Sequence, residues 1–489
     1  MRFNKIITFS LLVASLGACK KELAIQPEQN VSDQVVFTSK AGAQSALLGV
    51  YSTAQILDVF GSLPQLIGDY QADNVEFVGS FPTLQEIRDF TTLSTNSNVQ
   101  LIWQNHYRVI LRANSIITRV PGITEIGFTD AEKKQMVAEA KFMRAITYFQ
   151  LVNLFAQPFN CSNGSNLGVP LVLSEFTGTI EFPARSTVAQ VHAQIKKDLD
   201  ESIPDLLNVS QFTATSEKRG RATKGAARAL LSRFHLYRGE WQLAADFANQ
   251  IIIAPAADYA LATNYGFYDA LTAEDIFVSI MTTTDNSRTG SGGWAGYYRP
   301  TSATVPATGG GRGDAPFTTD LVNAYLQESG DRRLLLSDSA TGADVVRRRF
   351  TLKYPDGVTN DDDAPLIRVT EMYLNRAEAL AELNGVNQES ITLINALRTR
   401  AGLTPWTLTT FTTKQAFINA ILNERRKELA FEGHRRMDLL RRGLPLRSSG
   451  STAAISKPCD AASPRVILPI PNREIEINPG LQGQQNPGY

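Results

Sequence analysis

Side chains that bind metals or act as nucleophiles are scarce in this chain. It has three cysteines and four histidines in 489 residues, and the histidines at 106, 192, 235 and 434 form no His-x-x-x-His pair. Zinc and iron sites draw their ligands from such pairs or from cysteine clusters, so no metal and no cofactor is expected. The Gly-x-Ser-x-Gly turn of many hydrolases is also absent. These gaps count against an enzyme and predict no catalytic residues.

The chain also carries no formal net charge at pH 7. Lysine plus arginine number 48, and aspartate plus glutamate also number 48. A chain without excess positive charge has no strong field to attract a polyanion, so a nucleic-acid partner is not expected. Beyond the N-terminus, no apolar run reaches the roughly 20 residues needed to cross a bilayer.

The N-terminus predicts export and lipid attachment. Arg2 and Lys5 precede a short apolar stretch that ends in Leu16-Gly17-Ala18-Cys19. This order describes a secretory signal peptide, and a cysteine at the first mature position resembles a bacterial lipobox. We therefore expect a signal peptide over 1–18, an acylated Cys19 and a polar tether over 19–35. The alternative is an ordinary signal peptide with a chance cysteine. In an oxidising compartment the remaining pair, Cys161 and Cys459, could form a disulfide.

Hydrophobic periodicity predicts a mainly α-helical protein. In 222–253, apolar residues recur at i, i+3, i+4 and i+7 on both sides of Gly239, and paired alanines follow Trp241. This pattern describes a helical hairpin like the unit of tetratricopeptide repeats. A second hairpin is expected over 366–401, divided at Gly385. Further helices are expected over 39–57, 98–120, 130–156, 187–206, 413–432 and 434–442.

Long segments with little periodicity separate these helices, at 158–186, 281–320 and 337–365. Loops of this length in a compact protein are usually functional or disordered. The segment that begins at 281 carries Trp294, Tyr297 and Tyr298. A merely disordered linker would be poor in aromatic residues.

Four ordered motifs resemble those of the SusD/RagB family of outer-membrane lipoproteins. The first runs from Ala138 to Val152 and contains Ala138-Glu139-Ala140-Lys141-Phe142-Met143-Arg144-Ala145. The second is Arg368-Val369-Thr370-Glu371-Met372-Tyr373-Leu374-Asn375-Arg376-Ala377-Glu378-Ala379, and the third runs from Glu424 to Arg442. The fourth is the tail, from Leu468-Pro469-Ile470-Pro471 to Gly488-Tyr489. With the lipobox, the resemblance spans essentially the whole chain.

The resemblance implies a fold and a role. The fold would be a curved scaffold of tetratricopeptide-like hairpins, including 130–156, 187–253 and 366–401, within one domain over 36–489. A loop-rich ligand region around 60–97 and 281–365 would be inserted in it. The role would be to capture oligosaccharides, or in some branches peptides, and to deliver them to a TonB-dependent, SusC-like transporter. The protein would be lipid-anchored in the outer membrane. Lys20-Lys21-Glu22 resembles a surface-export signal and favours the exterior face of the outer membrane.

The segment 288–300 is the first candidate for ligand contact. Sugar rings have apolar faces that lie flat on aromatic rings, while their hydroxyl groups need fixed polar partners. Trp294, Tyr297 and Tyr298 could supply the aromatic platforms, and Arg299 and Asn286 could supply hydrogen bonds. In the alternative interpretation, these aromatic residues pin a long loop to the body of the protein.

The segment 69–81 is the second candidate. It contains Asp69, Asp73, Asn74, Phe77 and Phe81. Asp73 and Asn74 are predicted to contact ligand because early loops contribute polar contacts in the family. The alternative is that the acidic and amide side chains brace local turns.

Two acidic clusters have competing interpretations. Glu424, Glu428 and Glu432 share one helix face, which suits either acid–base chemistry or an ion-pair network with Arg425, Arg435, Arg368 or Arg376. The resemblance favours the network. The run 361–363, three aspartates, could contribute to a calcium site, but no EF-hand spacing surrounds it, and a solvated acidic turn is the favoured interpretation.

Three functions compete on this evidence. The favoured one is a nutrient-binding lipoprotein that works with a barrel transporter. A lipid-anchored glycoside hydrolase would need two carboxylates about 5–10 Å apart in a cleft. A pure scaffold would use its hairpins to bind other proteins.

Overall fold

The computed structural model describes residues 36–286, 292–300, 310–447, 459 and 464–489. The predicted signal peptide, Cys19 and the tether lie outside these residues. In the described part of the chain, no single helix is both long and apolar enough to cross a membrane. The bent pair Lys40–Gln55 and Leu57–Tyr70 meets those criteria only when taken together.

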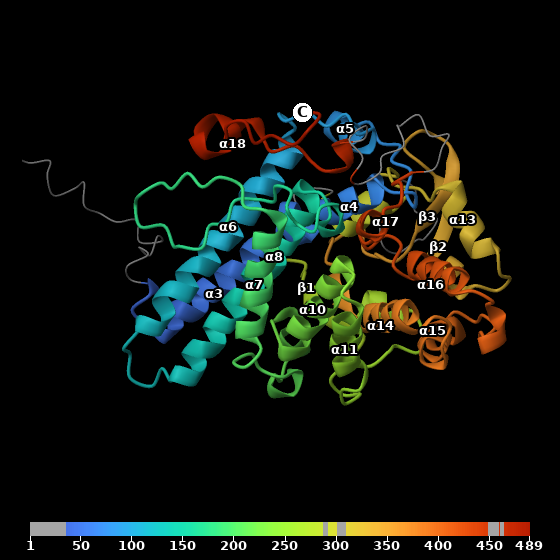
Figure 1. Cartoon of the computed structure of the whole chain (residues 1–489), viewed down its shortest axis with the longest axis horizontal. Coiled ribbons are helices and arrows are strands. Elements are labelled where there is room, and N and C mark those ends of the chain that lie inside the picture. The colour runs from blue at the N-terminus through green and yellow to red at the C-terminus, as the bar shows by residue number, and fades with distance from the viewer. Residues whose placement is uncertain (1–35, 287–291, 301–309, 448–458, 460–463) are drawn as a thin grey trace, which may run out of the picture.

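Helices dominate the structure, as the periodicity predicts (Figure 1). The long helices are α3 (Lys40–Gln55), α6 (Ser97–Arg119), α7 (Asp130–Phe155), α8 (Val188–Ser202), α10 (Lys224–Arg238), α11 (Trp241–Ile252), α14 (Val369–Asn384), α15 (Gln388–Arg400) and α16 (Lys414–Glu428). The short helices are α4 (Leu63–Tyr70), α5 (Pro82–Arg88), α9 (Thr215–Gly220), α12 (Trp294–Tyr298), α13 (Thr319–Leu326), α17 (Arg435–Arg441) and α18 (Asn472–Ile477).

The long helices pack as successive hairpins. Contacts join α6 to α7, α7 to α8, α10 to α11 and α14 to α15, and α11 packs against α14 to link two hairpins. In Figure 1 these helices follow one another from the left of the molecule to its lower right. Side-chain caps begin several of them, including the capping box of Thr129 and Glu132 at α7. The predicted hairpin scaffold is confirmed.

Small residues let α10 and α11 approach closely. Ala229 of α10 and Ala244 and Ala245 of α11 are fully buried. The hydroxyl of Ser232 crosses the interface and donates to the carbonyl of Ala244 over 2.9 Å. The paired alanines that the sequence analysis singled out therefore form this helix contact.

Gly239 ends α10 in the left-handed region, with φ 71°. A Cβ atom in this conformation approaches the following carbonyl oxygen, so Gly239→Ala is expected to lower the free energy of unfolding by about 1 kcal/mol. Urea unfolding followed by circular dichroism measures this change. Gly122→Ala is the matched control, because a Cβ there meets no atom within 4 Å and its φ lies outside the left-handed region. An equal loss in both variants would contradict the assignment.

The structure also contains two small antiparallel sheets that the sequence analysis did not predict. Strand β1 (Asp275–Ser279) pairs with β4 (Ala364–Arg368), and β2 (Ser337–Thr341) pairs with β3 (Arg347–Thr351). The predicted second hairpin therefore begins at Val369 and not at 366. Five-residue strands give too short a pattern to distinguish from a loop or from the start of a helix.

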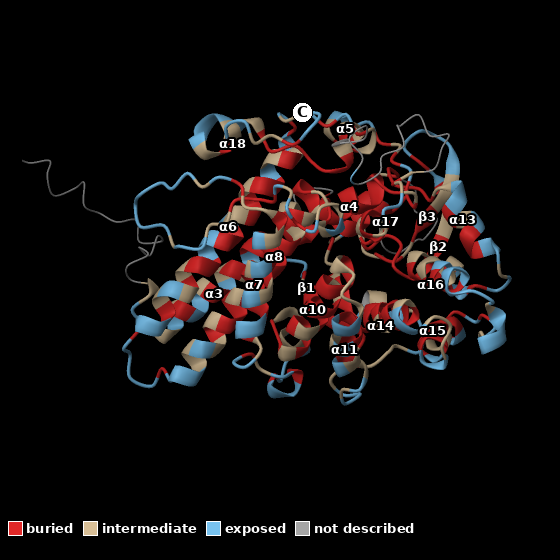
Figure 2. Cartoon of the chain, in the orientation of Figure 1, coloured by how far each residue is buried: buried red, intermediate tan, exposed pale blue. Residues whose placement is uncertain are grey.

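Buried residues lie mainly along the inward parts of the packed helices and continue into the loop-rich region (Figure 2). Tyr148, Phe142 and Phe155 of α7 are among the largest fully buried side chains. Phe142 meets Phe277 of β1 edge to face at 4.9 Å. Trp103 and Asn114 of α6 are buried in this core and Tyr107 packs against it, so these residues belong to the scaffold.

Cys161 and Cys459 form a disulfide, with Cα atoms 5.1 Å apart across 298 residues of sequence. The pairing that the sequence left open is therefore present. Closing so long a loop restricts the unfolded chain more than a local cross-link does. The bond fastens the segment after α7 to the C-terminal region, where the Cys459 amide also donates to Gln157.

Candidate functional site

The two segments predicted to contact ligand lie side by side. Backbone hydrogen bonds join the second segment to residues that follow the first, from Glu76 to Pro316 over 3.0 Å and from Val78 to Asp314 over 2.8 Å. A further link runs from the hydroxyl of Tyr298 to the carboxyl group of Asp69, over 2.5 Å. The fold thus brings residues more than 200 positions apart into one loop-rich region, at the upper right of Figure 1.

The aromatic side chains of α12 point into the protein. Trp294 is 1% exposed, Tyr298 is 0% and Tyr297 is 6%. Trp294 and Tyr298 pack against Tyr354, with ring centroids 4.8 and 5.6 Å away. This burial favours the interpretation in which the rings pin the segment to the body, and their contact with ligand stays a prediction.

The polar residues predicted beside them also have protein partners. Arg299 is buried and donates to the carbonyl groups of Tyr354 and Pro355. The amide of Asn286 donates to the carbonyl of Thr282 over 2.7 Å. A role in ligand binding for either residue stays a prediction.

Asp73 and Asn74 tie the early loop to the C-terminal helices. The Asp73 carboxylate accepts two hydrogen bonds from Arg435, of 2.6 and 2.8 Å, and Asn74 accepts one of 2.7 Å from Arg426. Burial opposes ionisation of Asp73, but Arg435 and Arg426 outweigh it and lower the pKa of Asp73. Asp73 therefore stays charged, while Asn74 is fully buried.

A surface cleft of about 680 Å³ opens beside these residues. We call it the loop cleft. Its lining residues come from the segment after α4, the end of α5 and the turn after it, the start of α13 and the segment after α17: Ala72, Asp73, Val75, Glu76, Phe77, Arg88, Asp89, Thr91, Thr318, Asp320 and Arg447. Of the seven residues predicted to bind ligand, Asp73 lies in this lining.

The loop cleft combines an apolar part with charged edges. Ala72, Val75 and Phe77 are buried at 1% exposure each. The side chain of Glu76 is 54% exposed and that of Asp89 is 37% exposed. Arg88 is fixed by its hydrogen bond to the carbonyl of Phe77, over 2.8 Å. The cleft thus offers hydrogen-bond donors and acceptors around an apolar surface.

An exposed aromatic ring lies in the same loop region. Phe81 is 44% exposed, and the guanidinium of Arg312 lies 4.7 Å from its centroid and 4.1 Å from that of Tyr297. Phe77 and Phe81 were within the predicted segment, but Arg312, Arg88 and Arg447 were not predicted. These arginines are far apart in the sequence and follow no common spacing. Only the folded loops bring them together, so the sequence did not indicate them.

The acidic row belongs to an ion-pair network, as the sequence analysis favoured, although α16 ends at Glu428 and Glu432 lies just beyond it. Its three glutamates and their basic partners are all buried. The pairs are Glu424 with Arg333, Arg398 and Lys427, Glu428 with Arg368 and Arg400, and Glu432 with Lys353 and Arg368.

Of the four arginines offered as alternative partners of the row, Arg368 is the one that pairs with it in the described part of the chain. Arg425 pairs with Asp438, Arg435 pairs with Asp73 and Arg376 pairs with Glu389. The sequence left these four arginines as alternatives, because arginines on the same or neighbouring helices can point to different faces.

The aspartates at 361–363 are not a fully solvated turn. Asp362 is buried and accepts the backbone N–H of Asp356, and Asp363 accepts that of Met281 over 2.7 Å. Burial raises the pKa of Asp362 to about 7. The expectation of a solvated turn was wrong for Asp362. Among the described residues, no group of three or more His, Cys, Asp or Glu is placed to hold a metal ion.

Comparisons with known proteins agree with this architecture. A family model described as starch-binding associating with outer membrane matches residues 25–236, and the SusD family model matches 345–489. SusD-like protein P25 of Formosa agariphila is 26% identical over 100% of both chains. Starch-binding protein SusD of Bacteroides thetaiotaomicron is 25% identical over 65% of this chain and 66% of its own. A solved SusD superfamily protein from Bacteroides thetaiotaomicron has a TM-score of 0.78 at 28% identity, covering 91% of this chain and 99% of its own.

Proposed function

The chain is a member of the SusD-like family, and from this premise we propose that it captures glycans outside the cell and delivers them to an outer-membrane transporter. The transporter would be a TonB-dependent, SusC-like barrel. The protein would act by binding and handover and would make or break no bonds.

The chemistry of the loop cleft carries this proposal. A sugar ring has an apolar face and a belt of hydroxyl groups, so it needs an apolar surface with fixed polar groups beside it. Val75 and Phe77, each 1% exposed, form the packed apolar floor of the cleft, and Glu76, Asp89 and Arg88 supply acceptors and donors at its edge. At about 680 Å³ the cleft lies within the range of about 300–1,000 Å³ that is usual for ligand sites.

The same residues fit a binding protein better than a hydrolase. Asp73 is held by Arg435 and Arg426, and Asp89 is paired with Arg88 at 2.7 Å. A glycosidase needs one carboxyl group with a raised pKa to protonate the leaving oxygen. The lowered pKa of Asp73 is the opposite of that requirement.

The N-terminal sequence and the family match support a proposed place of action at the outer membrane. One matching family model is described as associating with the outer membrane, and three curated relatives cover at least 99% of this chain. We propose that residues 1–18 are removed, that Cys19 carries the lipid and that 19–35 form the tether to the domain over 36–489. Two or more acyl chains are needed for stable anchoring. Lys20-Lys21-Glu22 supports the exterior face.

Affinity electrophoresis tests the binding function. The full-length chain in a non-glycosidic detergent is run through gels that hold amylopectin, laminarin, xylan, galactomannan or pectin. We expect at least one polysaccharide to retard the protein relative to a non-binding standard. Incubation with that polysaccharide should release no reducing ends. Retardation in no gel would contradict glycan capture, and reducing-end release would indicate a hydrolase.

A further inference from the structure

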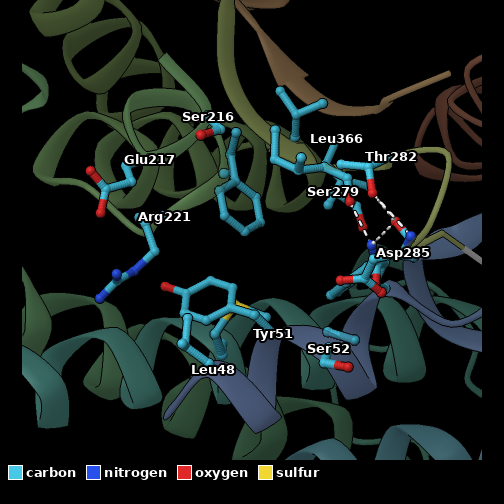
Figure 3. A pocket seen from close by; sticks show the side chains of 18 residues that line it. Leu48, Tyr51, Ser52, Ser216, Glu217, Arg221, Ser279, Thr282, Asp285 and Leu366 are labelled. Carbon is cyan, nitrogen blue, oxygen red and sulfur yellow. Dashed lines mark hydrogen bonds between the residues drawn. The ribbon is translucent and has the colours of Figure 1, made fainter. Parts of the chain in front are cut away.

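A second cavity of about 390 Å³ lies in the helical scaffold, between α3, α9 and β1 (Figure 3). We call it the scaffold cavity. Its lining includes Tyr51 and Ser52 of α3, Ser216 and Glu217 of α9, and Ser279 at the end of β1. It shares no lining residue with the loop cleft.

The aromatic wall of the scaffold cavity is rigid. The hydroxyl of Tyr51 donates to Glu139 over 2.6 Å and accepts the backbone N–H of Ala222 over 2.9 Å. Arg221 binds both oxygens of Glu139 at 2.7 Å, and its guanidinium lies 5.6 Å from the Tyr51 ring centroid. Because its only hydroxyl group is already bonded, Tyr51 offers the cavity mainly the surface of its ring. Phe277 lines the cavity beside it.

The opposite wall is also held in place. The amide of Gln55 donates to the carbonyl groups of Ile280 and Asp285, over 2.7 and 3.1 Å. A Cβ atom on Gly220 would come within 2.5 Å of the Ile280 side chain, so α9 and the end of β1 approach closely. These contacts fix the distance between the walls without filling the space.

Several polar groups that line the scaffold cavity have no partner within the described part of the chain. The hydroxyl groups of Ser216 and Ser279 and the carboxylates of Glu217 and Asp285 make no hydrogen bond or ion pair to any described residue. Figure 3 shows Glu217 beside Arg221 on one side of the cavity and Asp285 on the other. A ligand with several hydroxyl groups would satisfy these acceptors.

We propose that the scaffold cavity is a second saccharide site, which takes an uncharged sugar residue and rejects anionic sugars. An aromatic ring with neighbouring hydroxyl and carboxylate acceptors suits a sugar. Among the described lining residues the one cation is Arg221, which is engaged by Glu139, so Glu217 and Asp285 make this part of the rim negative and repel a sugar carboxylate or sulfate. This site goes beyond the function proposed for the loop cleft, because a sugar here could bind when the loop cleft is empty.

Hydrogen–deuterium exchange of the full-length chain, in a non-glycosidic detergent, reads the two sites separately. The probes are glucose, galactose, mannose, xylose and glucuronate, each at tens of millimolar. We expect at least one neutral sugar to slow exchange in peptides from α9 and from β1 through Asp285, and glucuronate to slow neither. Peptides over 72–91 report the loop cleft, so failure of the proposed function would be seen independently.

Substitutions then locate the effect. Ser52→Trp should fill the cavity and abolish the protection of α9 and β1. Ser45→Trp is its control, because Ser45 is exposed on the same face of α3 two turns away and does not line the cavity. The double variant Glu217→Gln, Asp285→Asn should let glucuronate protect α9. The proposal is overturned if none of the four neutral sugars protects these peptides, if protection survives Ser52→Trp, or if glucuronate protects the wild-type protein equally.

Discussion

Arg368→Met is expected to lower the free energy of unfolding by about 3–5 kcal/mol, because it leaves buried carboxylates without a counter-charge. Arg368 is 2% exposed and lies 3.1 Å from Glu274, 3.2 Å from Glu428 and 2.7 Å from Glu432. The methionine side chain fills similar volume, so a cavity contributes little to the loss.

Urea unfolding at constant pH measures the effect of Arg368→Met. Lys196→Met is the control, since Lys196 and Asp200 form a surface pair whose side chains are 45% and 46% exposed. Exposed pairs of this kind contribute about 0.3–0.5 kcal/mol. Similar small losses in both variants would show that the network around α16 does not stabilise the fold as its burial implies.

The effect of Asp69→Asn on the free energy of unfolding is expected to change sign with pH. Burial raises the pKa of Asp69 to about 7, against the partial compensation of hydrogen bonds from Tyr298 and Gly433 and the charge of Lys353, while Glu432 raises it further. A raised pKa in the folded state gives stability that is complete below about pH 4 and is lost as the pH rises through 7. The wild-type protein should therefore lose stability over this range, whereas the amide does not titrate.

The shift of the Asp69 pKa corresponds to about 4 kcal/mol at pH 8. In Asp69→Asn, the buried side-chain N–H groups without partners would lower the free energy of unfolding by about 1–2 kcal/mol. Asp69→Asn should thus be about 2 kcal/mol more stable than the wild type at pH 8 and slightly less stable at pH 5. Urea midpoints across this range measure the crossover. Asp205→Asn is the control, because Asp205 is exposed and no crossover is expected there. A stability difference between Asp69→Asn and the wild type that does not change with pH would contradict the protonation of buried Asp69.

The helical scaffold could be predicted from sequence because its signals are local. Observed α10 and α11 lie on either side of Gly239, and α14 ends at Gly385, as the periodicity and the glycines indicate. Repeated apolar spacing over three or four turns leaves few alternatives. The short strands were missed because their five residues give no such repetition.

The ligand region could be predicted only in outline. Aromatic residues near 294 mark an ordered loop, but the same residues suit a ring exposed to sugar or a ring packed on Tyr354. Only the fold decides that Trp294 is 1% exposed. Likewise, nothing local relates Arg88 to Thr318 and Arg447, which meet in the loop cleft through long-range pairing. Asp73, which lines the cleft, was predicted because the resemblance pointed to its segment, and its contact with ligand stays a prediction.

Binding by a variant with a filled loop cleft tests the central claim most directly. Thr91 is exposed and lines the cleft, so Thr91→Trp should occupy the space that a sugar would take. Affinity electrophoresis is run in the polysaccharide that retards the wild-type protein most, with Thr392→Trp on exposed α15 surface as the control. We predict that the apparent Kd rises at least about tenfold, or 1.4 kcal/mol, in Thr91→Trp and stays unchanged in the control. Retardation of Thr91→Trp equal to that of the wild type would contradict glycan capture in the loop cleft.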